Sequence, residues 1–249
     1  MPEHHTVTAP GALAGDLSWL AVERLLAEGA MPVITIGTAA KEHGYHLPLN
    51  TDALQAQWLG RAIAARYPAL VWPPINIGFY PAFLAYPGSI SMRAQSFEAL
   101  VLDVITSIAR HTAKPILAVN TGISTIAPLE NVRKHPAGPS LALHHVYRGA
   151  HLCACAERIC EQRHGGHGDE VETSVMLAIA PGKVQLHLAQ TYDRAVAPGP
   201  LSRQPGEPNY TPQGIWGDPA RASRQKGKAL LAAMLRDLDD SFKRLADLA

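Results

Sequence analysis

Two histidines and two acidic residues are concentrated in the twelve-residue segment KEHGYHLPLNTD, from Lys41 to Asp52. Imidazole nitrogens and carboxylate oxygens are the usual protein ligands of zinc and manganese. His43 and Asp52 are therefore candidates for a metal site. Both also have an ordinary structural use, because Asp52 can cap a helix, with Gln55 completing a capping box, and His43 and His46 can hydrogen-bond within a loop. Spacing alone slightly favours the structural use.

A second polar cluster is HGDEVETS, residues 167–174. His167 and Glu172 are candidates for catalysis or metal binding, and the glycines before and after His167 leave room for a ligand. The alternative is again structural, because Glu170 and Glu172 fall in the first turn of a predicted helix, where the helix dipole favours acids. The pattern of this cluster alone does not decide between the two.

The third cluster is NTGIST, residues 120–125, directly after an apolar run. A turn of this kind can present the backbone N–H groups of Thr121 and Gly122 to an anion or to a developing oxyanion. It can equally be a plain connection from a strand to a helix. The long segment 75–92 adds aromatic residues, among them Tyr80, whose ring faces either a ligand or the core.

These clusters need elements that bring them together, and the apolar patterns supply them. Short β-branched runs predict buried strands, and amphipathic runs predict helices between them. Alternation of this kind favours an α/β fold with a mostly parallel sheet covered on both faces. Because the sites of parallel sheets lie at the carboxyl ends of the strands, the three clusters should line one cleft. The predicted strands are 31–37, 70–74, 115–120 and 183–189, and the predicted helices are 52–67, 94–112, 139–163 after a short strand, 170–182 and 221–248.

Composition excludes several classes of protein. The chain has 249 residues, of which 47% are hydrophobic, and a net charge of +1, which predicts one domain over residues 1–249. No basic stripe predicts a nucleic-acid partner. Neither a signal peptide nor an apolar run of about 18 residues is present, so we expect no membrane contact and a cytoplasmic location. The three cysteines are interpreted as buried thiols on a helix rather than as a disulfide or zinc site.

Taken together and in this order, the clusters resemble the motifs of the creatininase family, the proteins similar to creatinine amidohydrolase. The family motif E-Q-H-G-P-H-L-P-x-x-T-D is similar to KEHGYHLPLNTD, and H-A-G-x-x-E-T-S is similar to HGDEVETS. A family loop P-G-T-x-S resembles YPGSIS at 86–91, and a late motif G-x-x-G-D-P-x-x-A-x-x-x-K-G resembles GIWGDPARASRQKG at 214–227. The resemblance covers about residues 15–240.

The resemblance implies a three-layer α/β/α domain with a mostly parallel central sheet, usually assembled into hexamers. It also implies a hydrolase of amide C–N bonds, often in cyclic or formylated substrates, that uses one or two divalent metals. Carried over by position, His43, Asp52 and Glu172 match metal ligands. His167 matches the histidine that moves protons near the scissile bond.

Two residues depart from the family pattern. Lys41 stands where the family has a ligand glutamate, and Gly122 stands where the N-G-H motif has a ligand histidine. Both losses fall on one metal position of a two-metal site, so we expect at most one divalent ion per subunit, zinc or manganese with iron as an alternative. Lys41 should lie near the vacated position and pair with Asp52, unless it points to solvent. A one-residue shift would instead bring Glu42 in as a ligand.

The sequence thus predicts a metal-dependent amidohydrolase acting on a C–N bond other than a peptide bond in a small molecule, cyclic amides included. His167, Lys41 and Glu42 are the candidate catalytic residues, and a homo-oligomer, a hexamer, is the expected assembly. The candidate substrate-binding residues are Asn120, Thr121, Gly122 and Tyr80. The alternative is a non-hydrolytic relative that binds a small molecule and has lost part of the metal site. The retention of His167, Asp52 and Glu172 favours the enzyme.

Overall fold

A five-stranded sheet, parallel throughout, forms the centre of the protein. The computed structural model describes residues 10–197 and 199–247. The strand order is β1-β3-β2-β4-β5, so β2 and β4 lie next to each other with their carboxyl ends at the same edge. The strands are β1 (Ala12–Leu13), β2 (Met31–Ile36), β3 (Ala69–Val71), β4 (Ile116–Asn120) and β5 (Leu141–His145).

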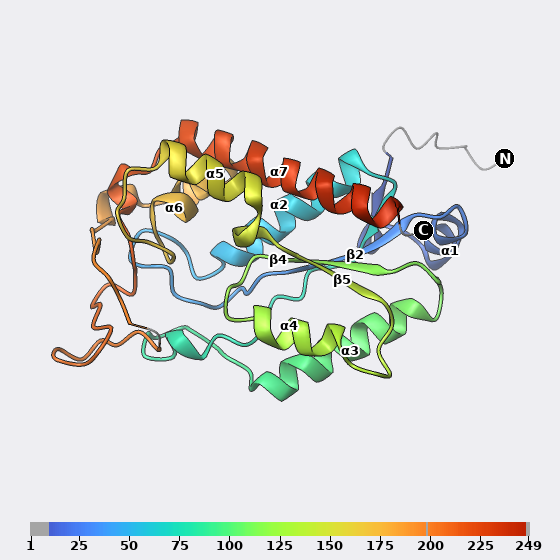
Figure 1. The fold of residues 1–249 in the computed structure, drawn as a ribbon, viewed down its shortest axis with the longest axis horizontal. Coiled ribbons are helices and arrows are strands. Elements are labelled where there is room, and N and C mark those ends of the chain that lie inside the picture. Colours follow the sequence, from blue (N-terminus) through green and yellow to red (C-terminus); the bar gives the residue numbers. More distant parts are fainter. Residues whose placement is uncertain (1–9, 198, 248–249) are drawn as a thin grey trace.

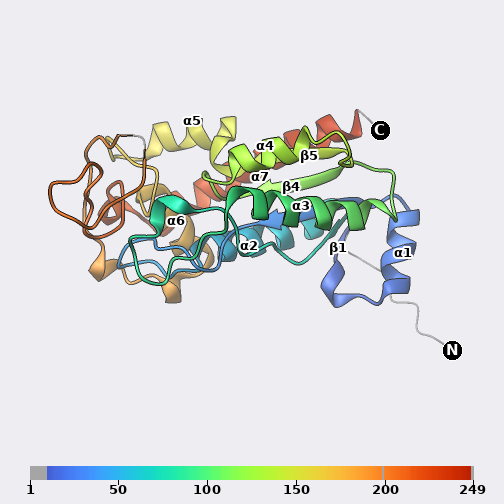
Figure 2. The same ribbon diagram turned by 90° about the horizontal axis from the view of Figure 1, so that it is seen from below.

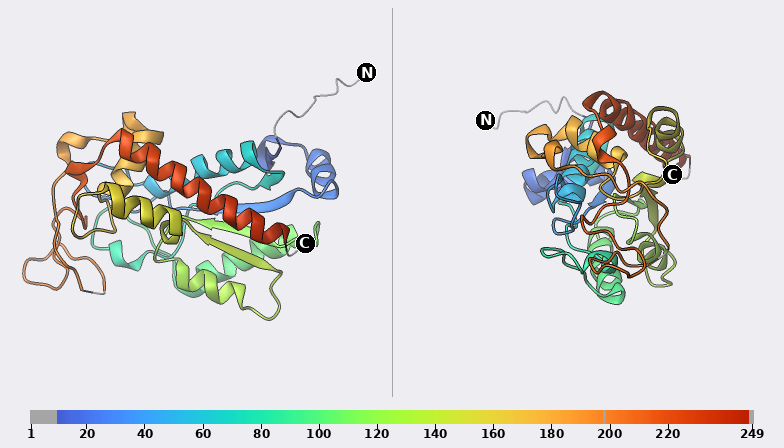
Figure 3. Two further views of the ribbon diagram at one scale, coloured as in Figure 1. Left: turned by 45° about the horizontal axis from the view of Figure 1, so that its top comes forward. Right: turned by 90° about the vertical axis from the view of Figure 1, so that its left-hand side faces the viewer.

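Helices cover both faces of this sheet, which confirms the predicted three-layer architecture (Figures 1 and 2). One layer holds α2 (Thr51–Arg66), α5 (Ala150–Ile159), α6 (Glu170–Ile179) and α7 (Arg224–Ala246). The opposite layer holds α3 (Ala94–Ala109) and α4 (Ile126–Arg133). The short helix α1 (Trp19–Ala27) packs near β3. Figure 3 shows α5 and α7 side by side on the same face of the sheet.

The sequence of β2 explains its central place. All six residues of MPVITI are buried. Met31 and Val33 join the core under α2 and α7, whereas Ile34 and Ile36 join the core over α3 and α4. A strand buried on both faces needs a continuous apolar run rather than an alternating one. Its carboxyl end therefore delivers the following polar segment to the edge of the sheet, as predicted.

Two predicted elements differ from the structure. Residues 183–189, predicted as a strand, lie in two short 3₁₀ turns, Pro181–Lys183 and Leu186–Leu188. The alternating pattern of this segment imitates a half-buried strand, but its leucines are 38–39% exposed and the Gln185 N–H donates to the His46 carbonyl, not to a strand. The short strand expected before the helix at 139–163 is confirmed as β5, but the helix itself is shorter than predicted, since a 3₁₀ turn follows β5 and α5 covers only Ala150–Ile159.

The prediction that all three cysteines are buried on a helix is wrong. Only Cys155 is buried, Cys153 is exposed on the same helix, and Cys160 follows its last residue. All three are free thiols. No helix within residues 10–197 and 199–247 is both long and apolar enough to cross a membrane. The single domain, the hexamer and the cytoplasmic location stay predictions.

His144 provides a test of the packing between β5 and α7. The ring is buried, and Nδ1 lies 2.9 Å from the Ser241 hydroxyl of α7. Burial, with a smaller contribution from the charges of His145 and Arg244, lowers the pKa of His144 to about 4. A histidine with a depressed pKa stabilises the fold above its unfolded pKa of about 6.5, and this contribution is lost as the pH falls toward the folded pKa.

We therefore expect His144 to cost the protein about 2 kcal/mol of unfolding free energy between pH 7 and pH 5. His144→Asn keeps a polar group beside Ser241 but does not titrate. Its unfolding free energy should therefore fall by about 2 kcal/mol less than that of the wild type between pH 7 and pH 5. Urea unfolding at the two pH values measures the difference. Equal losses in the two proteins would show that His144 is not held neutral.

Candidate active site

The polar segments meet at the carboxyl ends of β2 and β4, as predicted from the sequence. The loop after β2 carries Lys41, Glu42 and His43, and Asp52 lies in the first turn of α2. Glu172 lies in the first turn of α6, and His167 lies in the loop that precedes this helix. Asp169 caps α6 by accepting the N–H of Glu172, so the sequence HGDEVE folds as a helix start and also presents side chains to the site.

Lys41 and His43 hold the buried carboxylate of Asp52 between them. The Lys41 ammonium lies 2.8 Å from Oδ2, and His43 Nε2 lies 3.0 Å from Oδ1. Burial alone would raise the pKa of Asp52, but the charges of Lys41 and His43 lower it well below its usual range. Burial likewise opposes the charge of Lys41, yet Asp52, Glu172 and Glu42 together raise its pKa. The predicted pairing of Lys41 with Asp52 is confirmed, and Lys41 does not point to solvent.

Aromatic rings enclose the Lys41 ammonium from the other side. Its Nζ lies 5.3 Å from the ring centre of Tyr80 and 4.9 Å from that of Phe83, within cation–π range. The Tyr80 ring also fills the space beside Gly122. A Cβ atom on Gly122 would lie 2.9 Å from the Tyr80 hydroxyl oxygen and 2.8 Å from Oγ1 of Thr125. A histidine at position 122 therefore does not fit unless Tyr80 moves.

Glu42 and His167 form a second buried pair. His167 Nε2 lies 2.8 Å from Glu42 Oε1, and Glu42 Oε2 accepts the N–H of Gly44. The imidazole also packs on the ring of Phe83, with 4.3 Å between ring centres. Gly214, with φ at +79°, passes so close that a Cβ atom there would lie 2.1 Å from Glu42 Oε2. The orientation of His167 is therefore set by Glu42, and the position of Glu42 is set by a glycine of the late motif.

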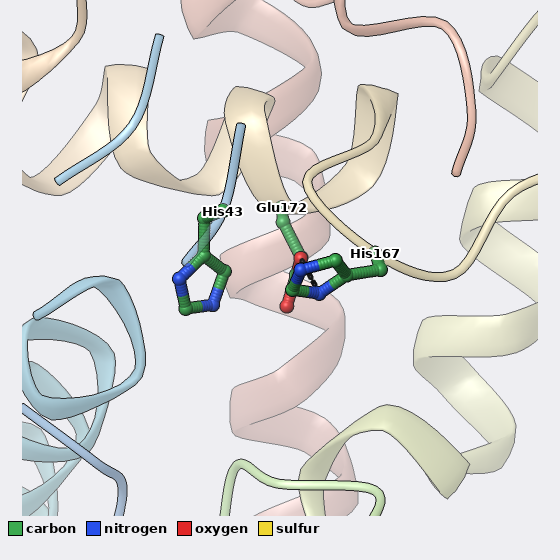
Figure 4. Close-up of side chains that lie close together, drawn as sticks. All are labelled: His43, His167 and Glu172. Atoms are coloured by element: carbon green, nitrogen blue, oxygen red, sulfur yellow. Dashed lines mark ion pairs between the residues drawn. The ribbon is translucent and has the colours of Figure 1, made fainter. Parts of the chain in front are cut away.

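His43, His167 and Glu172 form the one group of potential metal ligands among the described residues. Their donor atoms lie within 4.8 Å of one another, and Figure 4 shows the three side chains facing a common space. Glu172 Oε2 accepts the N–H of Gly168 at 2.6 Å and lies 3.9 Å from His167 Nδ1. Asp52, predicted as the third ligand, is not in this group but contacts it through His43.

The hydrogen bonds of His43 fit a cation site. Its Nδ1 lies 2.9 Å from the carbonyl oxygen of Lys41, an acceptor, so Nδ1 carries a proton. In the neutral ring, Nε2 is then an acceptor that faces the Asp52 carboxylate oxygen at 3.0 Å. Two acceptors at this distance are stable only with a proton or a cation between them. Fixing the free nitrogen of a ligand histidine through its other nitrogen is a common feature of metal sites.

In the turn after β4, which was predicted to bind substrate, the backbone N–H groups already donate hydrogen bonds within the protein. The Gly122 N–H donates to Asn120 Oδ1, and the Thr121 N–H donates to the Ile36 carbonyl. The Asn120 amide donates to the Gly122 carbonyl and lies 3.2 Å from His145 Nδ1. Neither backbone N–H is free to bind an oxyanion in this structure. Substrate contacts of Asn120, Thr121, Gly122 and Tyr80 stay a prediction. Tyr80 likewise faces Lys41 and Gly122.

Sequence reasoning missed some residues that complete the site. Phe83 packs on both Lys41 and His167, but its loop gave no sign of which rings turn inward. His46, interpreted as a loop residue, contacts the Thr173 hydroxyl of α6 at 2.8 Å, and burial with the charges of His43 and His167 lowers its pKa to about 4. His46 belongs to the HLP motif and Thr173 to the ETS motif, so the pairing of these motifs was the sequence signal for this contact.

Comparison with known proteins identifies the family. The sequence profile of the creatininases, described as creatinine amidohydrolase, matches residues 15–241. The chain belongs to the creatininase family. A creatinine amidohydrolase of Pseudomonas putida is 26% identical over 92% of this chain and 95% of that protein. A mycofactocin precursor peptide peptidase of Mycolicibacterium smegmatis is 27% identical over 97% of this chain and 94% of that protein.

Solved creatininases share the fold. One named as a manganese creatininase has a TM-score of 0.80 at 22% identity, over 94% of this chain and 98% of the other. A mutant creatininase named as a Zn–Zn type has a TM-score of 0.77 at 21% identity, with the same coverage. The predicted family and fold class are thereby confirmed, and membership in the creatininase family supports the predicted hydrolase class.

Proposed function

We propose that the protein hydrolyses an amide C–N bond in a small molecule, with one divalent metal as cofactor. The observation that carries this proposal is the convergence of His43, His167 and Glu172, with His167 held by Glu42. The restriction to bonds other than peptide bonds is no longer part of the proposal, since the relatives include both a creatinine amidohydrolase and a peptide peptidase.

From the group of His43, His167 and Glu172 we assign His43 and Glu172 as residues that would hold the metal, and add Asp52, which contacts His43. His167 is left out because its Nε2 is bound to Glu42. His43 Nε2 and Asp52 Oδ1 face each other at 3.0 Å, and the second carboxylate comes from α6. Three protein ligands leave an open position, as in catalytic rather than structural sites. When bound, such a cation supplies Lewis acidity toward a carbonyl oxygen and promotes ionisation of a water. Zinc and manganese both suit one imidazole and two carboxylates.

His167 is the residue placed to move a proton. Its Nε2 is bound to Glu42, and its Nδ1 faces the Glu172 side of the site. A histidine oriented by a carboxylate can take a proton from an attacking water and return it to the leaving nitrogen. Glu42 then orients the ring and stabilises its charged form. Lys41 contributes a fixed positive charge, which stabilises negative charge that develops on the substrate.

The proton-transfer role of His167 is tested by His167→Gln, measured on a panel that includes creatinine and formylated amines. We expect hydrolysis to fall about 10²- to 10⁴-fold, the usual contribution of a general acid–base group. Metal content should not change, because His167 is not a ligand in this proposal. His164→Gln, an exposed histidine of the same loop, is the matched control and should keep full activity.

Two results would contradict this assignment. Full activity in His167→Gln would remove His167 from the reaction. Loss of the metal in His167→Gln would make it a ligand and would move proton transfer to another group. The presence of Lys41 in place of a ligand also favours one alternative, a non-hydrolytic relative that binds a small molecule. That alternative predicts that a chain with one bound metal hydrolyses no member of the panel.

A further inference from the structure

A cavity of about 360 Å³ lies beside the candidate active site. Glu172 belongs both to its wall and to the group of His43, His167 and Glu172. The rest of the wall is largely apolar and aromatic, with Tyr147 and Trp216 as its large rings. Both rings are fixed, since the Tyr147 hydroxyl donates to Gln55 and the Trp216 N–H donates to the Arg194 carbonyl. The cavity is therefore a preformed space for an apolar group next to the reaction centre.

Arg148 is the one cationic residue that lines this cavity. Within residues 10–197 and 199–247, no carboxylate lies within 4.0 Å of its guanidinium, and no protein group accepts a hydrogen bond from it. Some arginines of the chain are paired with carboxylates, such as Arg66 with Asp239, Arg133 with Glu130 and Arg221 with Asp218, whereas others, such as Arg61 and Arg110, have no such partner. Among these, Arg148 is distinguished by lining the cavity. The five N–H donors of Arg148 thus face solvent and the cavity without an internal partner.

The acidic groups of the cavity are already engaged by the protein. Asp169 accepts from the Glu172 N–H and from the Gln162 side-chain amide. Glu172 accepts from the Gly168 N–H and faces the metal-ligand group. The start of α5 offers no further anion site, since the N–H groups of His151 and Leu152 donate to Asp237. Arg148 remains as the group that can recognise a charge on a ligand.

We propose that the cavity binds amides that carry a carboxylate, with an apolar or aromatic group between this carboxylate and the scissile bond. The guanidinium of Arg148 takes the carboxylate, for which its planar fork of donors is suited. Tyr147 and Trp216 contact the apolar part, and the amide reaches the Glu172 end. The inference rests on the proposed function only in taking the Glu172 end as the place of reaction; the recognition itself is a matter of binding.

The test is a binding measurement that does not depend on turnover. Calorimetry uses N-acetyl derivatives of 6-aminohexanoate, 4-aminomethylbenzoate and 4-aminophenylacetate, in which the apolar spacer lies between the amide and the carboxylate. Each is compared with its neutral carboxamide counterpart, on the metal-loaded protein and in chelator. We expect at least one carboxylate to bind about 10- to 100-fold more tightly than its counterpart, the range of a charge-assisted hydrogen bond. Arg148→Gln should remove that preference, and Arg148→Lys should keep part of it.

Arg158→Gln is the matched control, because Arg158 lies on α5, is exposed and does not line the cavity. It should keep the full preference. The inference is overturned when Arg148→Gln keeps the preference, or when none of the N-acetyl amino acids binds the wild-type protein better than its carboxamide. Absence of hydrolysis with the preference intact would instead count against the proposed function and leave the carboxylate site in place.

Discussion

Replacing Lys41 with Met should lower the free energy of unfolding of the metal-free protein by about 3–5 kcal/mol at pH 7. The Asp52 carboxylate is fully buried and lies 2.8 Å from the Lys41 ammonium. Met fills a similar volume but leaves this charge with His43 as its remaining partner. Removing one member of a buried ion pair is costly because the other charge stays desolvated. Urea unfolding in the presence of a chelator measures the effect.

Two further variants separate charge from packing. Lys41→Met combined with Asp52→Asn removes both charges and should recover most of the lost stability. Lys183→Met changes an exposed lysine and should alter stability by less than about 0.5 kcal/mol. The deficit of Lys41→Met should also shrink below about pH 4, because the lowered pKa of Asp52 stabilises the wild type only while the unfolded carboxyl is ionised. An unchanged midpoint in Lys41→Met would show that the pair contributes nothing.

One divalent ion, not two, should bind tightly to each chain in a calorimetric titration with zinc or manganese. From the motif resemblance, we propose that the second position of a two-metal relative corresponds to the space that the Lys41 ammonium and the Tyr80 ring fill here. A further cation about 4 Å from the ammonium would be repelled by about 4 kcal/mol per unit charge at an effective dielectric of 20. His43→Ala should abolish the single tight equivalent, and so should Glu172→Gln. Two tight equivalents in the wild type would refute the one-metal proposal.

Restoring the family's missing ligands should not by itself create a second site. From the sequence, Lys41→Glu with Gly122→His supplies the acid and the imidazole that the family has. The structure shows that position 122 has no room for a side chain beside Tyr80 and Thr125. We expect a second equivalent only when Tyr80→Ala is added to this pair of changes. The variant Tyr80→Ala alone is the control and should still bind one ion.

The sequence could predict the sheet and the positions of the polar clusters because both depend on local patterns. The run MPVITI is buried on both faces, and the segments after β2 and β4 therefore meet at one edge. The pairing of Lys41 with Asp52 could also be predicted, because a buried carboxylate that loses a metal needs another cation. The strand predicted at 183–189 failed because alternation of apolar residues does not show whether a partner strand is near.

The details of the site depend on contacts between distant segments, which no local pattern contains. Tyr80 and Thr125 come from different loops, and only their meeting shows that Gly122 has no space beside it. The hydrogen bonds of Thr121 and Gly122 were equally hidden, so the turn looked like an anion site although its N–H groups are occupied. The role proposed for Arg148 could not be predicted, because the sequence does not show that its side chain lines a cavity and has no internal partner.

The contact between Glu42 and Gly214 limits the order in which this protein can change during evolution. A side chain at position 214 would collide with the Glu42 carboxylate, which would have to leave His167. Substitution of Gly214 first would therefore damage the proton-transfer pair, whereas the same substitution after loss of Glu42 would meet no carboxylate. Descendants with a larger residue at 214 should thus be expected only in lineages that first abandoned the Glu42–His167 pair. Because its φ of +79° disfavours other residues in any case, a glycine at 214 can outlast the pair, whereas a larger residue there indicates that the pair has been lost.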